Sequence, residues 1–246
     1  MPSSLGIDQG LFSVAGNDPS AFPPLMGDGT HDNFWVDVQV TDAAPAGASY
    51  RLWPSYPTVP PTGNEDDFEQ TMGTEFSLSQ SCALNNIWFY SPAGSAQLPT
   101  RCGIWNVGTQ RVVSGTDNSS PSWSGAAASG WISCSYSDVI LSAGQYKVTV
   151  YTPGGSNNFY QETEDYFGGS GPASSAGVTY GPLSAPNAAK ATVPGQSTYQ
   201  HGGWLYPDIY DTEFNGQNRW VDVEVTPSSA SSSPPANSSG FLAFFP

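Results

Sequence analysis

Short runs of alternating apolar and polar residues, broken by turn-forming clusters, limit the fold of this chain more than any other feature. The run Gln145–Tyr151 (QYKVTVY) alternates cleanly, with Tyr146, Val148 and Val150 on one face and Lys147 on the other. No window longer than a turn or two has helical periodicity. Strands are expected at Thr74–Leu78, Leu84–Tyr90, Arg101–Val107, Val112–Val113, Trp131–Tyr136, Val139–Leu141 and Gln145–Tyr151. This spacing is typical of an all-β protein, and we expect an antiparallel, jelly-roll-like β-sandwich.

The shortage of charge narrows the range of partners. Only 11% of the residues are charged, and 6 Lys+Arg against 21 Asp+Glu give a net charge of −15. Six cations cannot form the large basic patch that phosphates attract, so neither nucleic acid nor an anionic membrane surface is an expected partner. No apolar stretch is long enough for membrane insertion. Aromatic residues, at 13%, supply apolar area for a folded core.

An internal repeat links the two ends of the chain. Asn33–Thr41 and Asn218–Thr226 share the pattern N-x-W-V-D-V-x-V-T, and each copy follows an aromatic-Pro pair. The segment between the copies is not duplicated. The first copy is therefore a strand without its own body, and it could complete a sheet in another chain or pack on the body of its own chain.

The repeat and the composition together divide the chain into five parts. These are a partial repeat (1–41), a linker (42–48), a β-sandwich module (49–227), a Ser/Pro-rich linker (228–240) and an apolar docking peptide (241–246). The peptide FLAFFP either folds back on its own domain or fills a groove on a neighbouring chain. Its assembly residues are expected to be Phe241, Leu242, Phe244 and Phe245. We expect a homo-oligomer, and Met1–Gly10 has neither the basic start nor the apolar run of an export signal.

The repeated W-V-D-V motif has two interpretations. In an extended strand, Trp35 and Asp37, or Trp220 and Asp222, project to one face while the valines project to the other. A ring beside a carboxylate suits a sugar, but it also suits a structural motif in which Asp accepts loop N–H groups and Trp covers the core edge. The repetition of the motif in a copy without a body favours the structural interpretation. Other tryptophans are expected in the core by their strand positions. Trp123 and Trp204 lie in Ser/Gly-rich loops and are the candidates for exposed host or ligand contacts.

Two acidic clusters are the candidates for metal or acid–base chemistry. They lie at 64–67 and 162–165, in expected loops, and the simplest interpretation is solvated loops. Hard oxygen ligands of this kind also suit calcium, although no EF-hand spacing is present, and a catalytic carboxylate pair is the third alternative. The weak calcium candidates are Glu65, Asp66, Asp67, Glu164 and Asp165. His31 and His201 belong to no catalytic motif, so no catalytic residue and no required cofactor are expected.

The three cysteines do not form the even-numbered framework of a disulfide-rich domain. Cys82, Cys102 and Cys134 are sparse and odd in number. Free buried thiols are expected, with a single bridge as the alternative for an exported protein.

A series of short motifs resembles a known family. In order, they are Leu52-Trp53, Gly73–Phe76, Ile87–Tyr90, Gly103–Trp105, Gly130-Trp131, Ala143–Tyr146, Gly181–Leu183, Tyr206-Pro207 and Asn218–Val223. They resemble an actinobacterial domain-of-unknown-function family, number 4082 in its series, over about Tyr50–Thr226, with a partial copy at Gly10–Thr41. The departures are Trp88 where the family usually has Arg and Arg219 where it has an aromatic residue.

The resemblance sets the functional expectation. The family occurs in secreted actinobacterial proteins and in minor tail proteins of their phages, and it implies an extracellular or virion β-sandwich without an established activity. We therefore expect a non-enzymatic structural and adhesion protein of a phage virion, in the tail or as capsid decoration. It would assemble with other virion proteins and contact a host cell-surface glycan. The alternative is an extracellular carbohydrate-binding module of a secreted actinobacterial protein.

Overall fold

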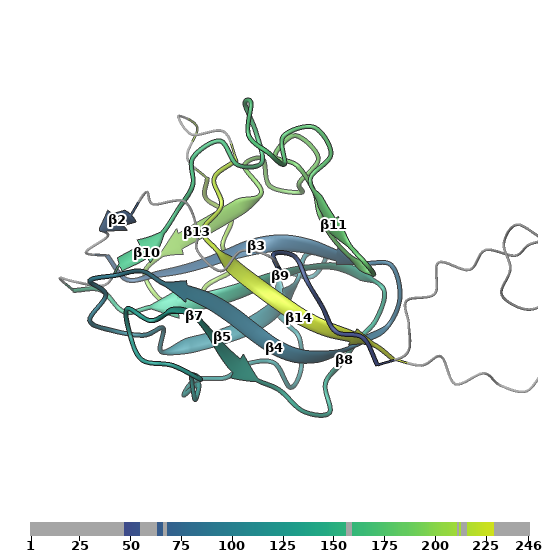
Figure 1. Cartoon of the computed structure of the whole chain (residues 1–246), viewed down its shortest axis with the longest axis horizontal. Coiled ribbons are helices and arrows are strands. Elements are labelled where there is room, and N and C mark those ends of the chain that lie inside the picture. The colour runs from purple at the N-terminus through teal and green to yellow at the C-terminus, as the bar shows by residue number, and fades with distance from the viewer. Residues whose placement is uncertain are drawn as a thin grey trace, which may run out of the picture. The chain divides into compact units, whose positions relative to one another are not determined.

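The computed structural model describes residues 47–54, 63–65, 68–155, 159–210, 212 and 216–228, with only the backbone given at 63–65 and 159. These residues form two antiparallel sheets packed against each other, together with a short ribbon, and they include no helix (Figure 1). The expectation of an antiparallel β-sandwich is confirmed. The partial repeat at 1–41 and the docking peptide at 241–246 lie outside the described residues.

The larger, seven-stranded sheet is built around two long central strands. β3 and β9 pair along their whole length, from Gln70 opposite Thr152 to Leu78 opposite Gly144. β5 pairs with the other edge of β9, from Arg101 opposite Tyr151 to Asn106 opposite Tyr146. The sheet consists of β11 (Val178–Tyr180), β12 (Leu183–Ala185), β3 (Gln70–Leu78), β9 (Gly144–Thr152), β5 (Arg101–Asn106) and β6 (Arg111–Val112), with β13 (Ser197–His201) also paired to β3.

The five-stranded sheet lies opposite and contains the second copy of the repeated motif. Its strands are β1 (Tyr50–Arg51), β14 (Val221–Pro227), β4 (Cys82–Ser91) and β7 (Gly130–Ser135), with β8 (Ile140–Leu141) also paired to β4. A separate ribbon joins β2 (Gly63–Glu65) to β10 (Phe159–Gln161). The strands expected from the sequence appear within a few residues of their expected bounds, whereas the short strands β1, β2 and β10–β13 were not anticipated.

The core lies between the two sheets and follows the alternation of each strand. β9 contributes Val148 and Val150, and β14 contributes Val221, Val223 and Val225, all with no exposed surface. Alternate residues of the same strands therefore point to the two outer faces. Burying each of these side chains contributes roughly 1.5–3 kcal/mol before the entropy of folding is counted.

Loops cover the outer face of the seven-stranded sheet. Glu75 and Lys147, opposite each other on β3 and β9, point outward but are almost fully buried. The Glu75 carboxylate accepts hydrogen bonds from the N–H and hydroxyl of Thr192, and Lys147 Nζ donates to Thr198 Oγ1 and to the Pro207 carbonyl. The segment from 192 to 208 is thereby fixed over the sheet.

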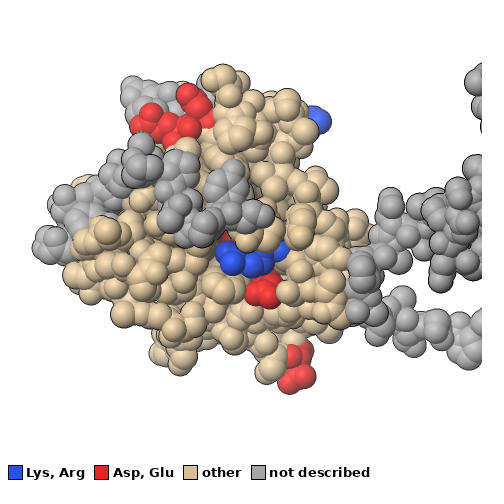
Figure 2. All heavy atoms as spheres, in the orientation of Figure 1, with Lys and Arg blue, Asp and Glu red and all other residues tan. Residues whose placement is uncertain are grey.

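The surface reflects the low charge of the chain. On the face seen in Figure 2, the described residues are mostly uncharged, and the acidic and basic groups are few and scattered. No helix among the described residues is long and apolar enough to cross a membrane.

Candidate functional site

Asp222 of the repeated motif is the centre of a buried hydrogen-bond network. Its carboxylate accepts the backbone N–H groups of Leu52, Trp53 and Val223 and pairs with Arg51 Nε at 3.1 Å. Burial raises the pKa of Asp222, and the Arg51 charge and the three N–H groups offset part of that shift. The residue has no exposed surface, so this carboxylate fixes the 51–53 segment to β14 and cannot contact a ligand directly.

Trp220 begins the strand differently from the simple alternation expected of W-V-D-V. It precedes β14, with a backbone φ of 49°, and its ring is fully buried. The ring contacts Trp53 at 5.5 Å and Tyr166 at 5.3 Å between centroids, and Nε1 donates to Thr163 Oγ1. These rings pack against one another within the core. The first copy of the motif, with Trp35 and Asp37, lies outside the described residues.

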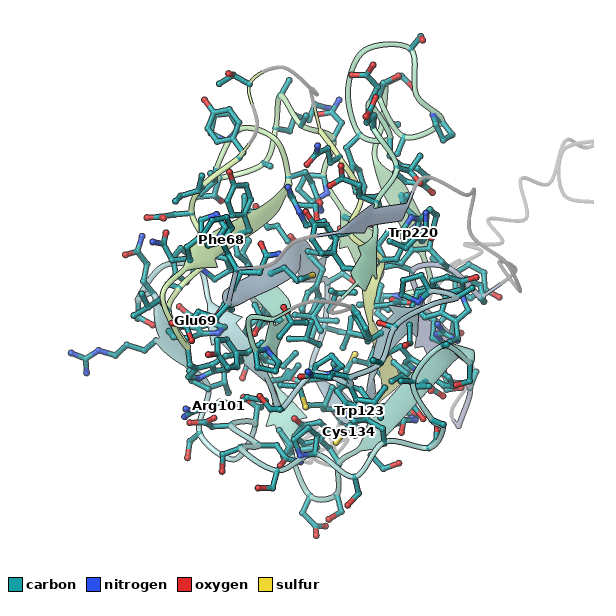
Figure 3. All side chains as sticks on the ribbon, turned by 90° about the vertical axis from the view of Figure 1, so that its left-hand side faces the viewer. Phe68, Glu69, Arg101, Trp123, Cys134 and Trp220 are labelled. Atoms are coloured by element: carbon teal, nitrogen blue, oxygen red, sulfur yellow. The ribbon has the colours of Figure 1, made fainter. Side chains whose placement is uncertain are left out.

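Trp204, one of the two loop tryptophans expected to contact a ligand, lies among outward-facing polar side chains. We call this group the Trp204 surface and define it as Glu69, Arg101, Asp117, Tyr151 and Trp204. Arg101 lies over the Trp204 ring, 5.0 Å from Cζ to centroid, and donates two hydrogen bonds of 2.7 and 2.6 Å to Asp117. Tyr151, opposite Arg101 in the sheet, donates a 2.7 Å hydrogen bond to Glu69. Figure 3 shows Glu69 and Arg101 on the same side of the molecule.

The indole of Trp204 is held against β5 rather than projecting freely. It lies 5.5 Å from the Trp105 ring at 48°, and a Cβ at Gly103 would come within 3.2 Å of it. Thr71 Oγ1 donates to the Gly203 carbonyl and accepts the N–H of Leu205, which fixes the backbone on both sides. Trp204 is half-buried, so part of its side chain remains accessible beside Arg101.

Lys147 supports this surface from beneath. Its ammonium lies 4.9 Å from the centroid of the Tyr206 ring, which itself contacts Trp105. Burial lowers the pKa of Lys147 to about 8, partly opposed by the charges of Glu75 and Asp208. Burial also raises the pKa of Tyr206 to about 12. The loop carrying Trp204 is thus anchored on a charged group removed from water.

Trp123, the first loop candidate, belongs to the edge of the core. Its Nε1 donates a 2.7 Å hydrogen bond to the Pro99 carbonyl, and its backbone forms a bridge with Cys134. The half-buried ring packs against the core residues. Figure 3 shows Trp123 next to Cys134.

The acidic cluster at 162–165 is divided between the interior and the surface. Glu162 is buried with an oxygen 3.9 Å from Arg219 Nη2, whereas Glu164 and Asp165 are exposed. The side chains of Glu65, Asp66 and Asp67 lie outside the described residues. Within the part of the chain that the structure describes, no three His, Cys, Asp or Glu side chains are grouped to hold a metal ion.

Sequence reasoning did not single out Arg101, Asp117 or Lys147. Two signals were available for β5: Arg101, Gly103 and Trp105 alternate onto one face, and a glycine there leaves room for a ring. Asp117 had no such signal, since only the path of its loop brings it to Arg101.

The fold defines the class of this protein as an antiparallel β-sandwich with loops covering one sheet. A family model described as a domain of unknown function (DUF4082) matches residues 56–221. The chain belongs to this family. The search of curated proteins found no match.

Trp88 and Arg219, the two residues that depart from the motifs of the resemblance, both take part in contacts between a cation and a ring. Trp88 lies under the Arg51 guanidinium, 3.9 Å from its centroid, and donates to Glu224. Arg219, fully buried, lies 4.7 Å from the ring of Tyr199 and donates to the Ser197 carbonyl. Each departure therefore has a local partner in this chain.

Proposed function

We propose that this protein is a non-enzymatic adhesion protein that binds carbohydrate at the Trp204 surface. The observation that carries the proposal is the fixed pairing of Arg101 with Asp117 beside the half-buried Trp204 ring. Sugars combine hydroxyl groups with a face of C–H bonds, and they are bound where hydrogen-bonding groups in fixed positions lie next to an aromatic ring. Here the charged groups face water, with 32% and 41% of the Arg101 and Asp117 side chains exposed, so they are accessible to a ligand.

We propose a phage virion as the setting, with the protein in the tail or decorating the capsid. The resemblance to domains of actinobacteriophage minor tail proteins supports this, and an acidic surface would limit aggregation in a crowded assembly. In this setting residues 1–41 and the FLAFFP peptide would join the protein to other virion proteins or to copies of itself, and the Trp204 surface would face the host envelope.

The alternative setting is a carbohydrate-binding module of a secreted actinobacterial protein. The Trp204 surface supports this setting as well, because attachment to a host glycan and binding of a polysaccharide by a secreted module require the same chemistry. The two settings differ in what the ends of the chain do and in the redox compartment where the protein folds.

The binding proposal is tested with Trp204→Ala and Arg101→Ala in the full chain. Both variants and the wild type are applied to an array of bacterial cell-wall polysaccharides, followed by calorimetry with the tightest oligosaccharide. Each substitution is expected to weaken binding at least tenfold. The matched control is Tyr180→Ala, which removes an exposed ring on β11 and should leave affinity unchanged. Retained affinity in Trp204→Ala, or no bound polysaccharide, would refute the proposal.

The assembly proposal is tested by deleting residues 241–246. Light scattering of the purified chain and incorporation into virions are the two measurements. We expect the deletion to reduce the oligomer and to prevent incorporation, while glycan binding persists. If both measurements are unchanged, the docking role of the peptide is wrong even though the adhesion surface stands.

A further inference from the structure

Cys102 and Cys134 meet in the core from opposite sheets. Cys102 lies on β5 of the seven-stranded sheet and Cys134 on β7 of the five-stranded sheet, with 0% and 2% of their surfaces exposed. The Cys102 sulfur is 3.2 Å from the Tyr136 hydroxyl. Both cysteines contact Asn118, which places two thiols from different sheets near each other.

The loop that connects β5 to β7 contacts both cysteines. Asn118 forms a backbone bridge with Cys102, with N–H···O distances of 3.0 and 2.9 Å, and its side-chain amide donates to Cys134 Sγ at 3.4 Å. Further along the loop, the backbone of Trp123 forms an antiparallel β-bridge with the backbone of Cys134. Asn118 contacts both cysteines and so connects β5 to β7 at this point.

We propose that Cys102 and Cys134 form a disulfide that links the two sheets when the chain folds in the presence of a disulfide-bearing oxidant. Cys82 is the cysteine left over. It lies at the start of β4, with its sulfur 3.5 Å from the Gln80 carbonyl, and burial raises its pKa to about 11, which makes it a poor nucleophile.

The reaction is thiol–disulfide exchange, with oxidised glutathione as the oxidant. The Cys134 thiolate attacks one glutathione sulfur, the S–S bond of the oxidant breaks, and one glutathione thiolate leaves. Cys102 then loses its proton to solvent, attacks the Cys134 sulfur and releases the second glutathione thiolate. The two protein thiols lose two electrons and two protons, and oxidised glutathione becomes two thiols. The exchange takes place while the chain folds, before the sheets close over the two thiols, which are 0% and 2% exposed in the folded chain.

The proposed disulfide also distinguishes the virion setting from the secreted setting. A protein secreted into an oxidising environment would carry the disulfide, whereas a virion protein that folds in a reducing cytoplasm would keep both thiols until it is released. The redox state of the protein taken from its natural source therefore reports where it folded.

Peptide mapping tests the pairing directly. The full chain is reduced in denaturant, refolded in a buffer of reduced and oxidised glutathione, alkylated and digested with trypsin. Cleavage after Arg51, Arg101, Arg111 and Lys147 places the three cysteines on separate peptides: 52–101, 102–111 and 112–147. We expect 102–111 linked to 112–147, with 52–101 alkylated. Alkylation of all three, a link that includes 52–101, or a disulfide-linked dimer would overturn the proposal.

Thermal unfolding provides a second measurement. Closing a loop of about 30 residues should raise Tm by about 10 °C in the oxidised protein relative to the reduced one. Cys82→Ser should keep this difference, and the double variant with Cys102→Ser and Cys134→Ser should abolish it. If the double variant does not fold, Cys82→Ser still decides: equal Tm values of its oxidised and reduced forms would overturn the proposal.

Discussion

The two outer faces of the sandwich bury charge in opposite ways. On the five-stranded sheet, Asp222 is covered by the neighbouring backbone, which donates N–H groups, and by an arginine of opposite charge. On the seven-stranded sheet, Lys147 is covered by the 198–208 loop and donates to two uncharged oxygens, Thr198 Oγ1 and the Pro207 carbonyl. The first charge has an ion-pair partner, while the hydrogen bonds of the second go to neutral groups.

This difference indicates what each charge does. A buried ion pair with several N–H donors holds one geometry firmly, because losing one partner leaves the other uncompensated. A lysine bound to neutral oxygens can lose its proton at accessible pH and still donate hydrogen bonds. Asp222 therefore fixes the start of the domain to its last strand, whereas Lys147 attaches the loop of the Trp204 surface in a way that depends on pH.

Replacing Asp222 should have the largest effect. Asp222→Ala removes the acceptor of two loop N–H groups and leaves Arg51 with an uncompensated charge, so we expect a loss of about 3–5 kcal/mol in the free energy of unfolding. Urea denaturation of the full chain measures it. The matched control is Glu224→Ala on the same face of β14, where Glu224 accepts from Asn86 and Trp88 and the loss should be about 1 kcal/mol. Equal losses would remove the distinction between the two acids.

Replacing Lys147 should have a smaller effect that changes with pH. Lys147→Met keeps the apolar stem, and we expect a loss of about 2 kcal/mol near pH 7 from two broken hydrogen bonds to a charged donor. The pKa of Lys147 is about 8 in the folded chain, below its ordinary value of 10.5. Between pH 8 and 10 this lysine is mostly protonated in the unfolded chain and mostly neutral in the folded chain. Because the unfolded state then binds more protons, the folded wild type becomes more stable as pH rises.

The pH-dependent contribution of Lys147 is measured by comparing the unfolding free energy of the wild type with that of Lys147→Met from pH 7 to 10. The gap between them should widen by about 2 kcal/mol. Lys190→Met, which removes the exposed lysine of the chain, should give a gap that does not change over the same range. A constant gap for Lys147→Met would show that the lysine keeps its ordinary pKa and that the loop attachment is not pH-dependent.

Replacing Asp117 should have the smallest effect on stability. Asp117→Asn breaks a pair that faces water, so we expect a loss below about 1 kcal/mol that shrinks further in 1 M salt. Asp138→Asn, at another exposed carboxylate, is the control. A loss as large as that of Asp222→Ala would mean that the Trp204 surface is part of the folding core and is not specialised for contact.

Much of the fold could be predicted because strand alternation is local. The run Gln145–Tyr151 showed which side chains share a face, and β9 has that arrangement. Turn residues between the runs indicated antiparallel connections, and the family motifs placed the module near the residues that the family model matches. The short strands β11–β13 were missed, because they form on the edges of a sheet that already exists and have little pattern of their own.

The candidate site was predicted only in part. Trp204 was singled out by its loop, but Arg101 and Asp117 are 16 positions apart, and their contact depends on how the chain returns after β6. The acidic cluster at 162–165 looked uniform in sequence. The structure nevertheless buries Glu162 beside Arg219 and exposes Glu164, because neighbouring residues of a turn point in different directions.

The sequence by itself determined that this chain is a β-sandwich with a repeated W-V-D-V motif, few charges and one family membership. These properties follow from spacing and composition, which each segment carries on its own. Only the tertiary structure decided which outward-facing polar residues are covered and which thiols meet. Alternation assigns a side chain to a face of a sheet, but what packs on that face depends on segments distant in the chain. A loop covers Lys147, and Asn118 brings Cys102 near Cys134 of the other sheet.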